Sequence, residues 1–179
     1  MKGDALETRL AELLKPARLV VLDVDGTLTD GAVTITESGE SLRFSVADGF
    51  GIKELQRAKI EVAWISGRAS PAATARAKGL GVSEVRLGQL RKLDALREIQ
   101  EKLGVEPRET VAMGDDLPDL TMRPRVALLA APSNARAEVR ERADLVTAAR
   151  GGEGAVRELA EAILRVQGRW AAIVGAFGG

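Results

Sequence analysis

Two groups of carboxylates follow short apolar runs in this sequence: Asp23 and Asp25 in the first, and Asp115, Asp116 and Asp119 in the second. An aspartate is ionised at neutral pH, so Asp23 can attack phosphorus without the help of a base. Asp25 can protonate a leaving alkoxide and then activate the hydrolytic water. Mg²⁺ prefers about six oxygen ligands, which carboxylates, a main-chain carbonyl and a phosphate can supply. These residues predict Mg²⁺-dependent phosphoryl transfer through an aspartyl phosphate.

A hydroxyl group and an ammonium group complete this chemistry. Ser66 opens the tripeptide Ser66-Gly67-Arg68 after an apolar run, and Lys92 opens an amphipathic segment. Both can hold the phosphoryl oxygens on which negative charge accumulates. Each fragment also has a structural explanation, because aspartates cap turns and helices, a Ser-Gly pair makes a turn, and a single cation is usually solvated. The hypothesis of phosphoryl transfer therefore depends on whether the fold brings these sequence fragments together in one site.

The composition narrows the alternatives. The chain has 179 residues, 45% of them hydrophobic, which suffices for one domain with a sizeable core. It contains no cysteine and no histidine, which excludes disulfides, thiolate or imidazole metal sites and histidine-activated nucleophiles. Basic and acidic residues each number 26, so the net charge gives no reason to expect nucleic-acid or membrane binding. The charged start and the lack of an apolar run of roughly 18 residues favour a cytoplasmic protein.

Apolar runs bounded by turn residues alternate with helical periodicity along the chain. The runs predict strands over residues 19–22, 62–65, 82–87, 110–113, 126–129 and 145–147. The periodicity predicts helices over residues 49–59, 70–79, 90–103, 117–122 and 134–143. This alternation indicates a Rossmann-like, doubly wound parallel sheet with helices on both faces. In such sheets ligands bind at the carboxyl ends of the strands, where the chemical fragments stand.

Two further segments fall outside this alternation. Residues 32–46 have the pattern of a β-hairpin, which has no obvious partner in a parallel sheet. Residues 151–179 predict a C-terminal helix and tail, with apolar residues at helical spacing and fraying expected from Ala171 onward. The glycine-rich run 151–154 is either a plain linker or the hinge of a mobile tail that docks on a neighbouring chain.

In this order, the four chemical fragments resemble the motifs of the haloacid dehalogenase superfamily phosphatases. The fragments are Asp23-Val24-Asp25-Gly26-Thr27, Ser66-Gly67-Arg68, Lys92, and Gly114-Asp115-Asp116 with Asp119. The resemblance implies a Rossmann-like fold, with Asp23 as nucleophile and Asp25 as general acid/base. It also implies a Mg²⁺ ion bound by Asp23, the main-chain carbonyl of Asp25 and Asp115. Asp116 and Asp119 would support these ligands.

A second set of segments is similar to one family of this superfamily, the 3-deoxy-D-manno-octulosonate 8-phosphate phosphatases. The segments are Thr29-Asp30-Gly31, the hairpin, residues 46–52, Gly88-Gln89 and residues 151–158. The family makes a precursor of bacterial lipopolysaccharide, and its members are tetramers whose hairpins and C-terminal segments complete neighbouring active sites. On this resemblance, the residues expected to contact substrate are Thr27, Gly67, Arg68, Asp48 and Arg157. Ala47 stands where the family commonly has arginine, which leaves the particular sugar acid open.

The superfamily inserts its covering domains between the first and second motifs or between the second and third. Here the first gap holds the hairpin and one helix, and the second holds one helix and one strand. We therefore expect a single domain over residues 1–179 without a separate cap, assembled as a homo-oligomer, most simply a tetramer. Deletion from Gly151 onward is expected to impair substrate use more than assembly. The expected substrate is a small phosphorylated sugar acid; the alternatives are a nonulosonate 9-phosphate, a nucleotide or nucleic-acid end, and a non-catalytic oligomeric module.

Overall fold

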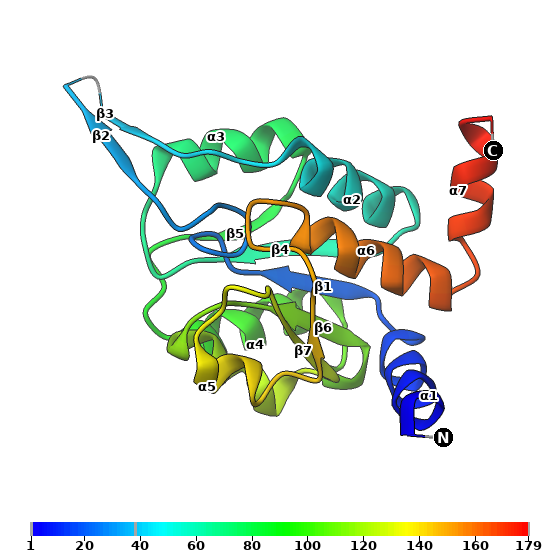
Figure 1. The fold of residues 1–179 in the computed structure, drawn as a ribbon. Coiled ribbons are helices and arrows are strands. Elements are labelled where there is room, and N and C mark those ends of the chain that lie inside the picture. The colour runs from blue at the N-terminus through cyan, green and yellow to red at the C-terminus, as the bar shows by residue number, and fades with distance from the viewer. Residues whose placement is uncertain (1, 38, 179) are drawn as a thin grey trace.

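The computed structural model describes residues 2–37 and 39–178. Within them, six parallel strands form a central sheet in the order β5-β4-β1-β6-β7-β8. The strands are β1 (Leu19–Leu22), β4 (Glu61–Ile65), β5 (Glu84–Arg86), β6 (Thr110–Met113), β7 (Leu128–Ala131) and β8 (Leu145–Val146). Helices cover both faces of this sheet (Figure 1), so the predicted doubly wound α/β fold is confirmed.

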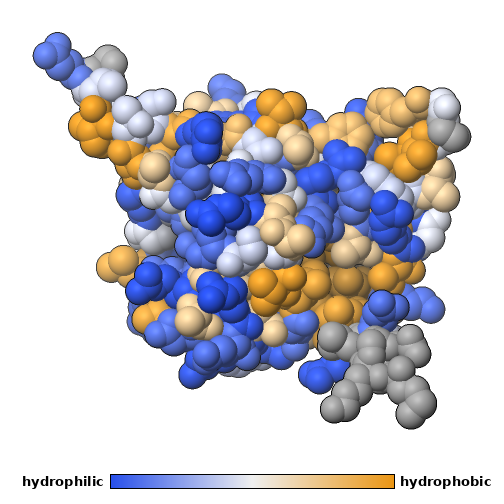
Figure 2. All heavy atoms as spheres, viewed as in Figure 1, coloured by the Kyte–Doolittle hydropathy of each residue, from blue (hydrophilic) through white to orange (hydrophobic). Residues whose placement is uncertain are grey.

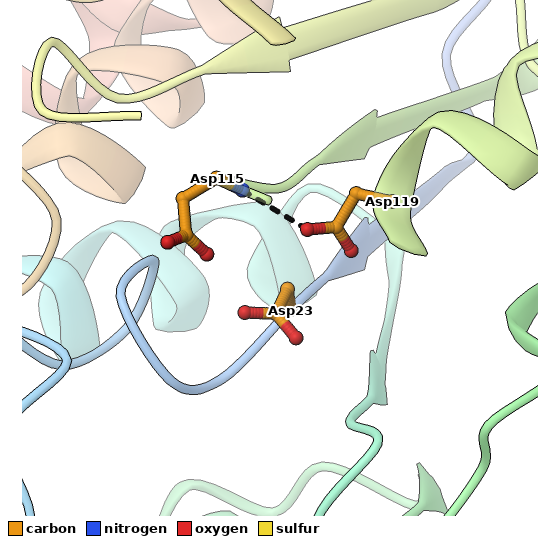
Figure 3. A group of neighbouring side chains, drawn as sticks. All are labelled: Asp23, Asp115 and Asp119. Carbon is orange, nitrogen blue, oxygen red and sulfur yellow. Dashed lines mark hydrogen bonds between the residues drawn. The ribbon is translucent and has the colours of Figure 1, made fainter. Parts of the chain in front are cut away.

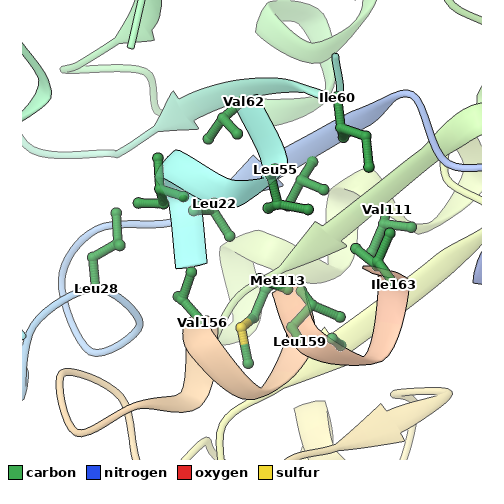
Figure 4. Close-up of a cluster of buried hydrophobic side chains, with 14 of the residues drawn as sticks. Leu22, Leu28, Leu55, Ile60, Val62, Val111, Met113, Val156, Leu159 and Ile163 are labelled. Carbon is green, nitrogen blue, oxygen red and sulfur yellow. The ribbon is translucent and has the colours of Figure 1, made fainter. Parts of the chain in front are cut away.

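The helices divide between the two faces of the sheet. One face is covered by α1 (Lys2–Leu14), α2 (Val46–Arg57), α3 (Pro71–Leu80) and α6 (Ala155–Val166). The other is covered mainly by α4 (Lys92–Leu103) and the 3₁₀ segment η2 (Leu117–Arg125). Figure 4 shows the first cluster, where aliphatic side chains of α2 and α6 meet those of β1, β4 and β6. Each fully buried aliphatic side chain contributes about 1.5–3 kcal/mol, so this cluster fixes the framework of the sheet.

Local signals account for most helix boundaries. The Ser70 side chain accepts the Ala73 N–H at 3.0 Å ahead of Pro71, and Gly104 ends α4 in the left-handed conformation, as predicted. Helix α2 begins at Val46, three residues earlier than expected, because the Ser45 side chain caps it. None of the helices in the described part of the chain has the length and apolar character that a membrane span requires.

The predicted hairpin is present but its strands are short. β2 (Thr34–Thr36) and β3 (Gly39–Ser41) pair antiparallel and project away from the body of the molecule (Figure 1). We call this projecting hairpin, β2 and β3, the arm. An isolated β-bridge between Thr29 and Phe44 closes its base. Residues 32, 33, 42, 43 and 45 of the expected 32–46 segment are irregular, and its last residue already belongs to α2.

The C-terminal segment differs most from expectation. Residues 151–154 are neither a free linker nor a hinge, because a Cβ atom on Gly151 would lie 1.8 Å from the Gly26 carbonyl oxygen. The Asn134 side chain accepts the Gly151 N–H at 2.7 Å and so fixes the glycine run. Asn134 therefore does not cap the helix expected to extend to residue 143, and α5 spans only Ala137–Arg140. The glycine run is therefore packed against the loop that follows β1.

Two expectations about the end of the chain change with the structure. Helix α6 buries Val156, Leu159 and Ile163 in the core, so deletion from Gly151 onward is now expected to impair folding itself. The segment from Ala171 to Ala176, for which fraying is expected, is helical and belongs to α7 (Trp170–Ala176), which packs next to α6.

Candidate active site

Parallel pairing brings the ends of three strands to one edge of the sheet. Leu22 of β1 lies level with Trp64 of β4 and with Met113 of β6. Side chains along β1 alternate between the two faces, which places Asp23 on the side covered by α4. Fragments far apart in the sequence therefore converge at the carboxyl edge, where they line one cavity of about 330 Å³.

The cavity brings together nine of the predicted residues. They are Asp23, Asp25, Ser66, Gly67, Arg68, Lys92, Asp115, Asp116 and Asp119. Five other residues complete its lining, namely Gly31, Val33, Gln89, Leu90 and Pro118. Val33 and Leu90 are exposed apolar side chains, 40% and 85% accessible, at the mouth of the cavity. Their apolar character gave no chemical signal in the sequence, and only the fold shows that they face the site.

Three carboxylates meet at the floor of the cavity. One oxygen atom each of Asp23, Asp115 and Asp119 lies within 4.8 Å of the other two, and Figure 3 shows the three side chains close together. The Lys92 side chain is 4% exposed, and its ammonium group donates to Asp23 and, at 2.6 Å, to Asp119. Three carboxylates and one ammonium leave two negative charges, which suits a divalent cation. The oxygen-only donor set fits Mg²⁺.

The same crowding changes the pKa values of the group. Burial, together with the neighbouring charge of Asp119, raises the pKa of Asp23 well above its usual value. Burial and Asp119 also raise the pKa of Asp115, to about 6. Burial works against the charge on Lys92, but the Asp23 and Asp119 carboxylates outweigh it and raise the pKa of the ammonium. Without a cation the carboxylates repel one another, so a divalent ion would stabilise their ionised forms.

Asp25 lines the same cavity but has a different set of partners. Its Oδ1 accepts from the Arg68 guanidinium at 2.5 Å, and its Oδ2 accepts from the Ser66 hydroxyl at 3.2 Å. The Ser66 oxygen in turn accepts the Arg68 N–H at 3.1 Å. The two aspartates of the first motif therefore differ in environment: Asp23 faces the carboxylate group and Lys92, whereas Asp25 is paired with a guanidinium.

Asp119 combines the two interpretations left open for it. Its Oδ2 accepts the N–H groups of Asp115 and Asp116 at 3.0 and 3.1 Å, which is a capping role at the start of η2. Its Oδ1 holds Lys92. A Cβ atom on Gly114 would lie 2.1 Å from the Asp119 carboxyl carbon, so glycine is required at that position. Asp119 thus links the fourth motif, Gly114-Asp115-Asp116, to Lys92.

Three residues expected to contact substrate lie outside the cavity lining. Thr27 is fully buried and its hydroxyl donates to Asp115 at 3.4 Å. Asp48 accepts the N–H groups of Gly154 and Arg157 at 3.3 and 2.8 Å, and so caps α6. The Arg157 side chain pairs with Glu161 at 2.7 Å and lies 4.4 Å from the centre of the Phe50 ring. Within one chain, these side chains support the framework around the cavity.

A parallel sheet with these four motifs at its carboxyl edge is the architecture of the haloacid dehalogenase-like hydrolases, whose family model matches residues 77–159. Over 119 residues the chain is 40% identical to the 3-deoxy-D-manno-octulosonate 8-phosphate phosphatase of Escherichia coli K12. This match covers 66% of the chain and 63% of that relative's length.

Solved structures resemble the chain over almost its whole length. The phosphatase of the same name from Moraxella catarrhalis, solved with a magnesium ion, a phosphate ion and KDO, has a TM-score of 0.92 at 37% identity and covers 95% of this chain and 98% of its own. A haloacid dehalogenase superfamily hydrolase of subfamily III A from Legionella pneumophila has a TM-score of 0.93 at 37% identity and covers 99% of both chains. The chain belongs to the 3-deoxy-D-manno-octulosonate 8-phosphate phosphatase family.

Proposed function

We propose that the protein is a cytoplasmic, Mg²⁺-dependent phosphomonoesterase that hydrolyses 3-deoxy-D-manno-octulosonate 8-phosphate in lipopolysaccharide precursor synthesis. The observation that carries the proposal is the pairing of Asp23 with Lys92 and of Asp25 with Arg68 in one cavity. The family membership supports the same substrate.

In the proposed reaction, an Asp23 carboxylate oxygen forms a bond to phosphorus and the bond from phosphorus to the sugar oxygen breaks. Asp25 in its protonated form gives the leaving oxygen its proton. In the second half-reaction Asp25 takes a proton from water, whose oxygen bonds to phosphorus while the bond from phosphorus to Asp23 breaks, so that phosphate leaves and the Asp23 carboxylate is restored. Lys92 and Ser66 stabilise charge on the transferring group. Asp23, the Asp25 carbonyl and Asp115 would hold Mg²⁺, which neutralises charge between nucleophile and phosphate when it is bound.

The substrate is tested with a panel of phosphomonoesters in Mg²⁺ buffer, with released phosphate as the measurement. The panel contains 3-deoxy-D-manno-octulosonate 8-phosphate, a nonulosonate 9-phosphate, a nucleoside monophosphate and a 5′-phosphorylated oligonucleotide. We expect the octulosonate to have the highest kcat/KM. A preference for the nonulosonate would change the sugar but keep the mechanism. Absence of hydrolysis across the panel would favour the non-catalytic alternative.

Replacement of Asp115 by alanine tests the proposed metal site. We expect Asp115→Ala to raise the Mg²⁺ concentration needed for half-maximal activity by at least about 10-fold, because a ligand and its charge are lost. Asp94→Ala is the matched control, since the Asp94 carboxylate pairs with Arg91 at 2.8 Å and is not part of the cavity lining. Activity is titrated with Mg²⁺ after dialysis against EDTA. Full activity of the wild type in EDTA would contradict the metal requirement.

We propose further that the working unit is a homotetramer in which hairpins from neighbouring chains pair. An isolated two-stranded arm is marginally stable in water. Val33 and Ile35 on the arm are 40% and 75% exposed, and Figure 2 shows apolar side chains along the projecting hairpin. Leu90 and Leu117, beside the cavity mouth, are also exposed and would be covered by a neighbouring chain.

Light scattering tests the assembly. A tetramer of 19.0 kDa chains should have about four times that mass. Ile35→Asp should lower the measured mass of the assembly, because it introduces a charge among the exposed apolar side chains proposed to pair between chains. Replacement of the exposed Glu37 by alanine in the same hairpin should leave the mass unchanged. A monomeric wild type at micromolar concentration would overturn the proposal.

A further inference from the structure

One carboxylate of the projecting arm reaches back to the body of the molecule. Glu40 lies in β3, and its side chain is only 15% exposed although its neighbours in the arm are open to solvent. Its Oε1 accepts from the Ser70 hydroxyl, and its Oε2 accepts from the Arg68 guanidinium. Ser70 is itself fixed because its oxygen caps α3. Glu40 is therefore held by a rigid element and holds a residue of the cavity.

Arg68 uses its two terminal nitrogens on two different carboxylates. Nη1 donates to Glu40, and Nη2 donates to Asp25 Oδ1. Arginine has a long side chain that loses much rotational freedom when it is fixed, so two anchors orient the planar guanidinium far better than one. Glu40 is the anchor outside the catalytic motifs. The Ser70 hydroxyl and then Arg68 lower the pKa of Glu40, so its carboxylate is ionised at neutral pH.

We infer that Glu40 is a positioning residue: it holds the Arg68 guanidinium against Asp25 and thereby fixes the orientation of the Asp25 carboxylate. This inference rests on the proposed function. Without Glu40 the guanidinium can swing away from Asp25, whose remaining hydrogen-bond partner among the described residues is the Ser66 hydroxyl. A misdirected acid/base slows bond cleavage more than it weakens binding of the phosphate group, because Lys92 and the other motifs remain in place.

A double-mutant cycle tests this inference, with kcat and KM measured for p-nitrophenyl phosphate and for the octulosonate phosphate. Glu40→Ala should lower kcat by about 10-fold, with a smaller change in KM. Glu40→Gln should recover part of the loss, because the amide oxygen still accepts from Arg68. In an Arg68→Ala background, Glu40→Ala should have no further effect. Effects that multiply, or an unchanged kcat in Glu40→Ala, would overturn the inference.

A second measurement does not depend on activity. In the ¹H–¹⁵N NMR spectrum, the Arg68 Nε–H signal is assigned by its loss in Arg68→Ala, and we expect Glu40→Ala to broaden or shift it. Glu37→Ala is the matched control, because this exposed carboxylate lies in the same hairpin. An Arg68 signal identical in wild type and Glu40→Ala would overturn the inference even if the enzyme is active. If the wild type hydrolyses no phosphomonoester, the proposed function fails while the NMR result still decides whether Glu40 holds Arg68.

Discussion

Asp23→Asn should abolish phosphatase activity, lowering kcat by at least about 10³-fold, while the protein stays folded. The amide is nearly the same size as the carboxylate, but it cannot attack phosphorus. Asp23 sits at the floor of the cavity, 5% exposed, and burial already disfavours its charge, so the neutral replacement does not weaken the fold. Steady-state turnover and thermal unfolding of the same preparation measure both parts of the prediction.

Two comparisons make this result specific to the nucleophile. Asp94→Asn is the matched control, because Asp94 is a half-buried carboxylate near the start of α4 that pairs with Arg91 at 2.8 Å. Asp25→Asn should slow both half-reactions without removing the nucleophile. Beryllium fluoride, which mimics a phosphoryl group on a carboxylate, should bind the wild type but not Asp23→Asn. Wild-type turnover in Asp23→Asn would exclude an aspartyl phosphate.

Lys92→Met should damage both stability and activity. The substitution removes the ammonium that lies between Asp23 and Asp119 and leaves two buried carboxylates facing each other. Breaking a buried ion pair on one side costs about 3–5 kcal/mol, so we expect a loss near the lower end of this range in EDTA. The loss of a charged contact to the phosphoryl group should lower kcat by about 10²-fold or more. Urea unfolding at neutral pH and turnover in Mg²⁺ measure the two effects.

Added Mg²⁺ should restore part of the stability of Lys92→Met, because a cation that binds only the folded protein shifts the unfolding equilibrium. The exposed Lys78→Met in α3 serves as the control for loss of one positive charge. If Lys92→Met unfolded at the same urea concentration as the wild type in EDTA, the two short contacts of Lys92 would not contribute to folding.

The catalytic edge could be predicted because its signals are local. Each motif follows an apolar run, and a run such as 19–22 indicates a buried strand whatever the rest of the chain does. Parallel pairing then brings the strand ends together without further information. For the same reason the boundaries of β1, β6 and the C-terminus of α4 agree with expectation.

Features that depend on one side chain meeting a distant one could not be predicted. Glu40 lies 28 residues from Arg68, and nothing in the arm's alternating pattern distinguishes it from Glu37. The motif around Asp48 predicts a substrate ligand. Its carboxylate instead caps α6, because it accepts the N–H groups of Gly154 and Arg157, which lie 106 and 109 residues further along the chain. The glycine run 151–154 looked like a linker because glycine is common in flexible turns; here it permits a close backbone approach.

The packing of Gly151 against Gly26 bears on how the protein is made. The loop that follows Asp23 leaves the ribosome early, but the backbone that covers it is synthesised more than a hundred residues later, followed directly by α6. At about 5–20 residues per second, on the order of ten seconds separate these two events. During this interval the apolar side chains that α6 covers in the folded protein have no α6 to pack against. The site is therefore completed last, although its nucleophile is made first.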